Sequence, residues 1–276
     1  MKTISVRTVT EKIREAFLDK GVHICENYLK IMENALEKEE GAARFALDVM
    51  LKNARVAEKT SSPVCQDTGM AVVFLTIGQD VRFTDGFIGD AVNEGVRQAY
   101  KDGYFRKSVL DPLTRKNTLD NTPAVIHYEI VEGEVFRADI MLKGFGSENM
   151  SRLYMLSPSE GKDGVERVIA ETAINAGGNP CPPVLLGVGI GGTMEKACLM
   201  SKKVLMRDGD NPDEELRDME KKLTDVINAS GTGPQGFGGK LSCLGVKIEK
   251  YPTHLAGLPV AVTVQCHAVR HACFEL

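Results

Sequence analysis

The stretch that decides the fold is Val184-Leu185-Leu186-Gly187-Val188-Gly189-Ile190-Gly191-Gly192. It predicts a short buried strand, followed by a helix over Met194–Met206. Its glycines match the G-x-G-x-x-G pattern of dinucleotide-binding loops, which join a strand to a helix. A dinucleotide fold also needs an acidic residue after a second strand, about 20 residues further on. Asp208 and Asp210 have that separation but follow a helix, so we expect a different fold.

The elements around this stretch do not alternate regularly between strand and helix. Apolar residues recur at helical spacing between residues 8 and about 59, which predicts three helices. The β-branched run Ala71–Ile77 predicts a buried strand. Residues 124–142 alternate apolar and polar side chains around Glu132–Gly133, which predicts a β-hairpin.

This order of elements predicts an α+β fold, a mixed α/β domain behind an N-terminal helical lobe. We expect a single domain over residues 1–276, with the lobe over about 1–60 and the body over about 61–276.

Composition excludes several classes of protein. The 276 residues carry 34 Lys and Arg against 38 Asp and Glu, a net charge of −4. Nucleic-acid and anionic-membrane binders need clustered basic surface, so neither partner is expected. No apolar run approaches the roughly 18–20 residues that cross a bilayer, and the N-terminus lacks the apolar core of a secretory signal. We therefore expect a cytoplasmic protein.

The seven cysteines are the unusual feature of the composition. In a reducing cytosol they are not expected to form a disulfide framework, so they are small buried hydrophobes, metal ligands or nucleophiles. No C-x-x-C pair occurs, and Cys266-His267 with His271 is too crowded for a usual structural zinc site. A catalytic cysteine with a histidine partner stays open, because the sequence favours no single pair.

Four segments between apolar elements are rich in glycine, proline and polar residues. Such loops allow close backbone approach and often line sites. They are Ser61–Gly69, Lys143–Asn149, Gly177–Pro183 and Gly231–Gly239.

Cysteines in separate loops suit one further kind of centre. An iron–sulfur cluster held by three thiolates leaves one iron open, where it acts as a Lewis acid. Removal of water from a 2-hydroxy acid needs such help, because hydroxide is a poor leaving group. The reaction also needs an acid near the hydroxyl, a base for the carbon-bound proton, and cationic or amide groups for the carboxylates.

The loop motifs carry a specific resemblance. In their order along the chain, they resemble the α subunit of the class I fumarases and of the related L-tartrate dehydratase, from about residue 50 to the end. The motifs are Pro63–Gly69, Lys143–Asn149, Asn179–Pro183 with Gly187–Gly192, Gly233–Gly239, and His254–Val262 with Cys266.

This resemblance implies a [4Fe–4S] cluster ligated by Cys65, Cys181 and Cys266, with the fourth iron open to substrate. The other four cysteines, of which Cys243 and Cys273 are the strongest competitors for a ligand role, are then expected to be core residues.

The resemblance also implies roles for five other residues. Asp67 is the acid that serves the leaving hydroxyl, and His254 hydrogen-bonds the substrate. Gln66 and the amide of Gly146 contact the substrate. Arg106 pairs with a substrate carboxylate, for which a planar guanidinium is suited. Taken alone, Asp67, Arg106 and His254 could equally be a turn cap, a surface charge and a core histidine.

The implied activity is the reversible hydration of fumarate to malate by an iron–sulfur hydro-lyase, with L-tartrate dehydratase as the close alternative. In the family a second domain or β subunit supplies the base, so we expect a β subunit partner and a heterotetramer. A nicotinamide-dependent dehydrogenase and a non-catalytic protein with buried cysteines are the rival interpretations.

Overall fold

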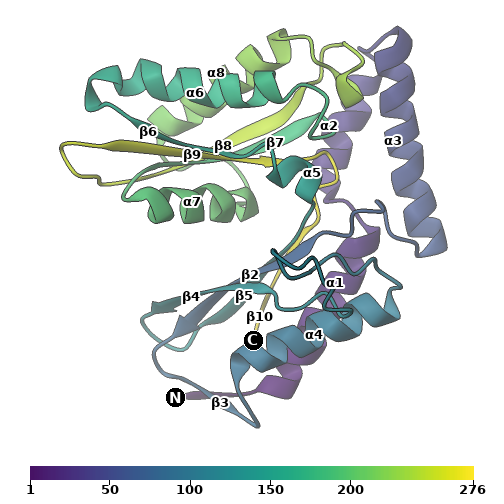
Figure 1. Cartoon of the computed structure of the whole chain (residues 1–276), viewed down its shortest axis with the longest axis vertical. Helices are drawn as coiled ribbons and strands as arrows, with labels where there is room; N and C mark the ends of the chain where they lie inside the picture. Colours follow the sequence, from purple (N-terminus) through teal and green to yellow (C-terminus); the bar gives the residue numbers. More distant parts are fainter. The chain divides into compact units, whose positions relative to one another are not determined.

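The computed structural model describes residues 1–276 and divides them into two compact units (Figure 1). Helices and mixed sheets occur in both, in agreement with the predicted mixture of α and β structure. The first unit consists of Met1–Cys25, Asn53–Phe145 and Arg270–Leu276, and the second of Glu26–Lys52 and Gly146–Val269. Each unit is described by itself.

A four-stranded sheet with two helices forms the first unit. The sheet has the order β10-β5-β2-β4, and β1 pairs with β3 as a separate parallel ribbon. The elements are β1 (Lys2–Ser5), α1 (Val6–Val22), β2 (Met70–Gly78), β3 (Val81–Thr84), α4 (Ile88–Asp102), β4 (Val125–Val131), β5 (Phe136–Lys143) and β10 (His271–Glu275).

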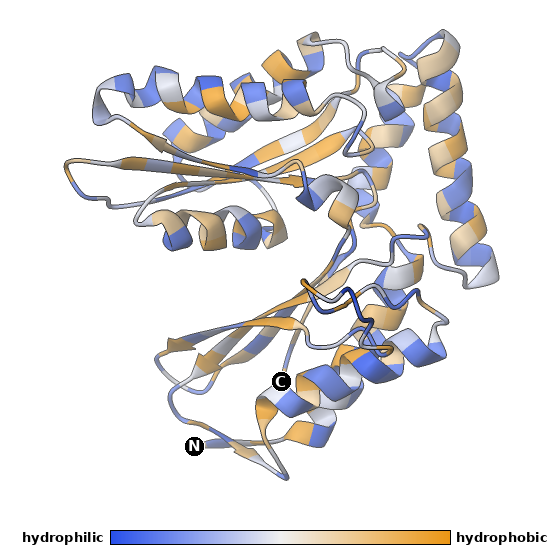
Figure 2. Ribbon diagram, in the orientation of Figure 1, coloured by the Kyte–Doolittle hydropathy of each residue, from blue (hydrophilic) through white to orange (hydrophobic).

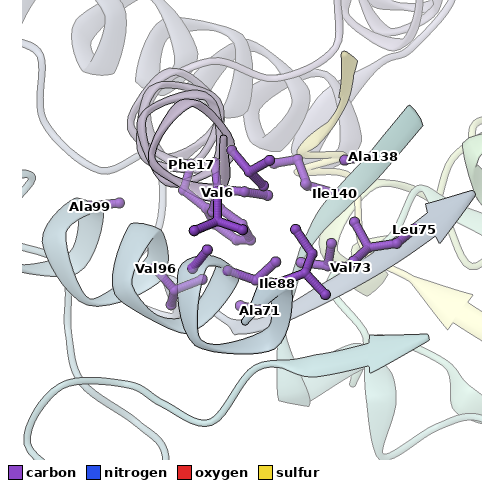
Figure 3. Close-up of a cluster of buried hydrophobic side chains, with 14 of the residues drawn as sticks. Val6, Phe17, Ala71, Val73, Leu75, Ile88, Val96, Ala99, Ala138 and Ile140 are labelled. Atoms are coloured by element: carbon purple, nitrogen blue, oxygen red, sulfur yellow. The ribbon is translucent and has the colours of Figure 1, made fainter. Parts of the chain in front are cut away.

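The core of this unit lies between the two helices and the sheet (Figure 3). Apolar residues of α1 recur every three or four positions, so that one face of the helix is apolar. In Figure 3 the side chains of Phe17 from α1, Val96 from α4 and Ile140 from β5 gather in one cluster. Phe17, Val96 and Ile140 are completely buried, which makes this cluster the main source of stability in the unit.

The predicted hairpin over residues 124–142 is wrong. Both strands form, but β2 lies between them, pairing with β4 in parallel and with β5 antiparallel. The reason is that β2 is almost wholly buried and apolar, so it needs a neighbour on each edge. The segment after β4 instead caps the β2–β3 turn, where the Asp80 N–H donates to the Gly133 carbonyl at 3.0 Å.

The second unit is a four-stranded sheet covered by helices on both faces. The order is β6-β9-β7-β8, with β7 and β8 parallel and β9 antiparallel to its neighbours. Figure 1 shows α6 and α8 on one face and α7 on the other. The elements are α2 (Glu26–Leu36), β6 (Arg152–Leu156), α6 (Gly161–Ala176), β7 (Val184–Gly191), α7 (Met194–Lys203), α8 (Glu214–Ala229), β8 (Cys243–Tyr251) and β9 (Leu258–Gln265).

Two helices cross the boundaries between the units. They are α3 (Gly41–Thr60) and the short α5 (Phe145–Glu148). The three helices predicted before residue 60 are confirmed as α1, α2 and α3. The single-turn 3₁₀ segments are Pro158–Glu160, Val204–Met206 and Pro234–Gly236. In Figure 2 the strands of the second unit are mostly hydrophobic, whereas the helices that cover them carry both colours.

The glycine pattern that begins in β7 serves packing. A Cβ atom on Gly187 would lie 2.0 Å from the Ser201 carbonyl oxygen, and one on Gly189 would lie 2.2 Å from that of Ala197. Both carbonyls belong to α7, which packs directly on the strand. Glycine in a strand often marks such a close backbone approach. The resemblance to a dinucleotide loop therefore has a structural explanation.

Candidate functional site

The Cys65–Gly69 loop of the first unit is held by a buried tyrosine. The Tyr100 hydroxyl donates to the carbonyls of Thr68 and Gly69, each at 2.8 Å. Burial raises the pKa of Tyr100, so the phenol keeps its proton and stays a donor. Sequence reasoning did not select Tyr100, because it lies on the apolar face of a helix like any core aromatic.

Gly69 closes this loop against β5. Its φ is +81°, and a Cβ there would lie 2.9 Å from backbone atoms of Leu142 and Lys143. Only glycine combines that dihedral with so close an approach. The glycine thus brings the polar loop onto the end of the sheet.

Both oxygens of Asp67 are oriented by backbone donors. Oδ1 accepts the Gly69 N–H at 3.0 Å, and Oδ2 accepts the Phe145 N–H at 2.7 Å. A carboxylate oxygen has two lone pairs, so each still has room for another partner. The half-buried side chain is therefore fixed in direction and still has lone pairs free to accept from a substrate.

Arg106 lies on a segment tied to the same loop. The Thr68 hydroxyl donates to the Arg106 carbonyl at 2.8 Å, while the Arg106 side chain is exposed. Gln66 is also exposed and Cys65 is half-buried. The first unit therefore brings together four of the predicted site residues, Cys65, Gln66, Asp67 and Arg106.

The second unit places two predicted ligands at one end of its sheet. Cys181 precedes β7 and Cys266 follows β9, and the antiparallel register pairs Leu185 with Gln265 at that end. The segments are joined by His267, whose N–H and Nδ1 lie 3.4 Å and 3.0 Å from the Cys181 carbonyl oxygen. Cys181 is exposed and Cys266 is half-buried, and neither forms a disulfide.

Gln265 is a second residue that sequence reasoning missed. It is completely buried, and its amide nitrogen lies 3.6 Å from Cys266 Sγ and 3.3 Å from the Ala268 carbonyl oxygen. A donor to a ligating sulfur tunes an iron–sulfur centre. An amide within the apolar run of the closing strand is the signal that could have identified it.

Gly146 lies beside the loop that carries Cys181. A Cβ on Gly146 would be 3.9 Å from the Asn179 carbonyl oxygen, so the two backbones are close neighbours. Phe145, the residue before it, donates to Asp67. Neither unit by itself gathers three His, Cys, Asp or Glu side chains in an arrangement that holds a metal ion.

His254 lies at the opposite end of the second sheet. It follows β8, which runs parallel to β7, whereas Cys181 precedes β7. Strand β9 separates the His254 loop from Cys266, and its eight residues span roughly 23 Å. The exposed His254 lines a pocket of about 450 Å³ with an apolar floor that includes Val165 and Ile190. Within one chain, His254 does not meet the two thiols.

The remaining four cysteines are predicted to be core residues, but the structure buries only some of them. Cys243 is buried at the start of β8, and burial raises the pKa of its thiol to about 12. Cys198 and Cys273 are exposed, which corrects the prediction for these two. Cys25 is half-buried, with its sulfur 3.4 Å from the His271 carbonyl oxygen. Cys198 lies off the buried face of α7, which is formed by Ala197, Met200 and Ser201, and Cys273 is an exposed position of the edge strand β10.

Comparison of this sequence with known sequences identifies the class of protein. The family model described as fumarate hydratase (Fumerase) matches residues 10–275, so the chain belongs to this family of hydro-lyases. A "Putative L(+)-tartrate dehydratase subunit alpha" of Methanocaldococcus jannaschii is 38% identical over 273 residues, which cover 96% of each chain.

Two other relatives show the range of the family. The L(+)-tartrate dehydratase subunit alpha of Escherichia coli strain K12 is 31% identical, over 80% of this chain and 75% of that protein. A "Putative fumarate hydratase class I" of Geobacillus stearothermophilus is 29% identical over 94% of this chain, which spans only 53% of that protein. None of the helices is both long and apolar enough to cross a membrane.

Proposed function

We propose that this chain is the α subunit of a hydro-lyase that reversibly hydrates fumarate to malate. The observation that carries the proposal is the joining of the Cys181 and Cys266 segments at one end of a sheet, in a chain of the fumarate hydratase family. Two thiols held there by rigid strands suit a shared inorganic centre better than two separate roles.

The residues fit a [4Fe–4S] cluster held by Cys65, Cys181 and Cys266. Thiolates are its usual ligands, and Gln265 already directs an N–H toward the sulfur of Cys266. When bound through three thiolates, the cluster supplies a Lewis-acidic iron for the substrate hydroxyl. The rest of the chemistry belongs to side chains of the protein.

Asp67 would act on the oxygen that enters or leaves. In dehydration the C–O bond breaks with its electron pair on oxygen, and a proton from the Asp67 carboxyl completes a water molecule. In hydration the same oxygen of Asp67 accepts a proton from water. The N–H donors of Gly69 and Phe145 keep the carboxyl in one orientation for both directions.

Arg106, Gln66 and the amide of Gly146 would hold the dicarboxylate. Arg106 is exposed, so its planar fork is free to pair with a carboxylate through two hydrogen bonds. Gln66 adjoins both Cys65 and Asp67, which keeps its amide within reach of the same substrate.

The position of His254 implies that one α chain contributes this histidine to the active site of another. Because His254 and Cys266 lie at opposite ends of β9, a histidine that touches substrate at the cluster would come from another copy of the α chain. The β subunit that the family resemblance implies would supply the base for the carbon-bound proton. Two relatives that bear the name subunit alpha support this division of the site.

The tartrate reaction is the second candidate. It is favoured by the 38% and 31% identical relatives, both named as tartrate dehydratase α subunits. L-Tartrate differs from malate by one hydroxyl, so both substrates would use the same cluster, acid and carboxylate contacts. The product of the tartrate reaction is oxaloacetate.

One experiment tests the activity and the choice of substrate. The chain, co-purified anaerobically with its β subunit, should contain iron and sulfide and absorb broadly near about 400 nm. It should then convert malate, tartrate or both, and kcat/KM for each ranks the two candidates. A complex without iron, or one inert toward both substrates, would refute the proposal. Full activity of the α chain alone would refute the divided site.

A further inference from the structure

Arg270 is a buried cation, and two of its three guanidinium nitrogens have no hydrogen-bond partner. The residue is 1% exposed, and it is among the largest fully buried side chains of the chain. Its Nε and Nη1 atoms are buried and have no hydrogen-bond partner. A buried charge without partners is strongly unfavourable, so a native residue of this kind requires a compensating group.

Asp67 is an acidic neighbour of the guanidinium. A Cβ atom added to Gly144 would lie 3.1 Å from Asp67 Oδ2 and 3.6 Å from Arg270 Nη2. The carboxylate and the guanidinium therefore both lie beside Gly144. They form no direct ion pair, and the Asp67 oxygens accept hydrogen bonds from the Gly69 and Phe145 N–H groups. The positive charge of Arg270 is therefore not neutralised by an ion pair and can act on other anionic groups nearby.

Electrostatics at Tyr100 support this placement. Burial raises the pKa of Tyr100, the positive charge of Arg270 opposes that shift, and the charge of Asp67 adds to it. Both charges thus act on the hydroxyl that holds the Cys65–Gly69 loop. The other buried cation nearby, Lys143, donates to the Gly144 carbonyl at 3.2 Å.

The chain also keeps Arg270 close to two of the predicted ligands. Arg270 follows Cys266 by four residues and Asp67 follows Cys65 by two, and an extended residue spans at most about 3.6 Å. The Cα atom of Arg270 therefore lies within about 14 Å of that of Cys266, and Asp67 lies within about 7 Å of Cys65. A cluster with three thiolate ligands, carrying a dicarboxylate, is strongly anionic.

We infer that Arg270 is a positioning residue, the buried positive charge that balances the anionic centre formed by Asp67, the thiolate-ligated cluster and its carboxylate substrate. This inference rests on the proposed function. Charge near a cluster sets its reduction potential, and buried neighbours of the ligands orient them. Arg270 acts through these groups and is not a contact of the reacting atoms.

The variants are Arg270→Met, which keeps the length but removes the charge, and Arg270→Lys, which keeps the charge. Arg137→Met is the matched control, because Arg137 lies in the same unit but pairs with Asp139. The first measurement is the Tm of the complex after the iron has been chelated. Removal of an uncompensated buried charge should raise Tm in Arg270→Met only.

The second measurement uses the reconstituted complex. In Arg270→Met the midpoint potential of the cluster should fall, because reduction adds negative charge that is no longer balanced. Its kcat should fall about 10- to 100-fold with a smaller change in KM. Arg270→Lys should keep most of the wild-type midpoint potential and kcat, and Arg137→Met should match the wild type in both quantities.

The outcomes separate the two proposals. A wild-type complex that assembles no cluster overturns the proposed function and this inference with it. A wild-type complex that assembles the cluster while Arg270→Met leaves its potential unchanged overturns the inference alone. A lower Tm of the iron-free Arg270→Met complex also overturns it, because that result assigns Arg270 an ordinary structural role.

Discussion

Cys181 and His254 lie at opposite ends of the same sheet, one before β7 and the other after the parallel strand β8. Strand length alone separates them by roughly 20 Å. Two residues that the family resemblance assigns to one site therefore cannot share it within a single chain. The proposed active site shared between copies of the α chain would resolve this conflict.

A mixing experiment tests the shared site. Complexes with Cys181→Ser alone or His254→Ala alone should be inactive. Co-expression of the two variant α chains should restore about a quarter of wild-type activity, since half of randomly mixed pairs are hybrids and each hybrid has one intact site. If activity stays at the level of the single variants, His254 acts in its own chain or not at all.

The three predicted ligands should differ from a cysteine outside the proposed site. Cys65→Ser, Cys181→Ser and Cys266→Ser should each lose most of the iron and the absorbance near about 400 nm after reconstitution, because serine replaces a thiolate ligand. Cys198→Ser is the matched control, being an exposed free thiol of the second unit. Equal iron content in all four variants would argue against this ligand set.

The glycines of β7 should matter for stability and not for phosphate binding. Gly189→Ala places a Cβ 2.2 Å from the Ala197 carbonyl oxygen, so the helix must shift and the free energy of unfolding should fall by about 1–3 kcal/mol. Gly257→Ala has open space around it and should change little. Urea denaturation measures both. An unchanged midpoint in Gly189→Ala would contradict the packing explanation.

The buried thiol of Cys243 should lower the free energy of unfolding at high pH. Its thiol stays protonated in the folded chain to about pH 12, whereas the unfolded thiol ionises near its ordinary value of 9.0. Above pH 9.0 the unfolded state therefore binds fewer protons and is favoured.

The comparison that checks this uses Cys243→Ala. The wild type should lose up to about 1.4 kcal/mol per pH unit relative to the variant between pH 9 and 11, as measured by urea unfolding. Cys198→Ala serves as the control. Parallel pH profiles of wild type and Cys243→Ala would show that the Cys243 thiol is not protected by burial, and would reopen its exclusion as a ligand.

Much of the fold could be predicted from local patterns. The helices before residue 60, the apolar strand at Ala71–Ile77 and the run from Val184 are visible as periodicity, because burial of one face or both imposes it. The partners of each strand were not predictable in the same way. The 124–142 segment has the alternation of a hairpin, yet the more apolar β2 takes the place between its strands.

The candidate site was likewise predictable only in part from local sequence patterns. Motifs around Cys65, Cys181 and Cys266 can be recognised because thiols within Gly- and Pro-rich loops are rare and chemically specific. Tyr100, Gln265 and Arg270 carry no such mark. Tyr100 lies on the apolar face of α4, Gln265 ends the apolar strand β9, and Arg270 lies in the segment between β9 and β10. Their importance comes from what they touch, and that is set by neighbours far away in the sequence.

By itself, the sequence determined the family and the class of reaction and predicted the site side chains, because these depend on residue type and local order. Only the tertiary structure decided which groups meet. It set Asp67 between two backbone donors, buried two guanidinium nitrogens of Arg270 without a hydrogen-bond partner and placed His254 at the far end of the sheet. The physical reason is that strand pairing and close packing set distances, while the order of residues along the chain limits them only loosely.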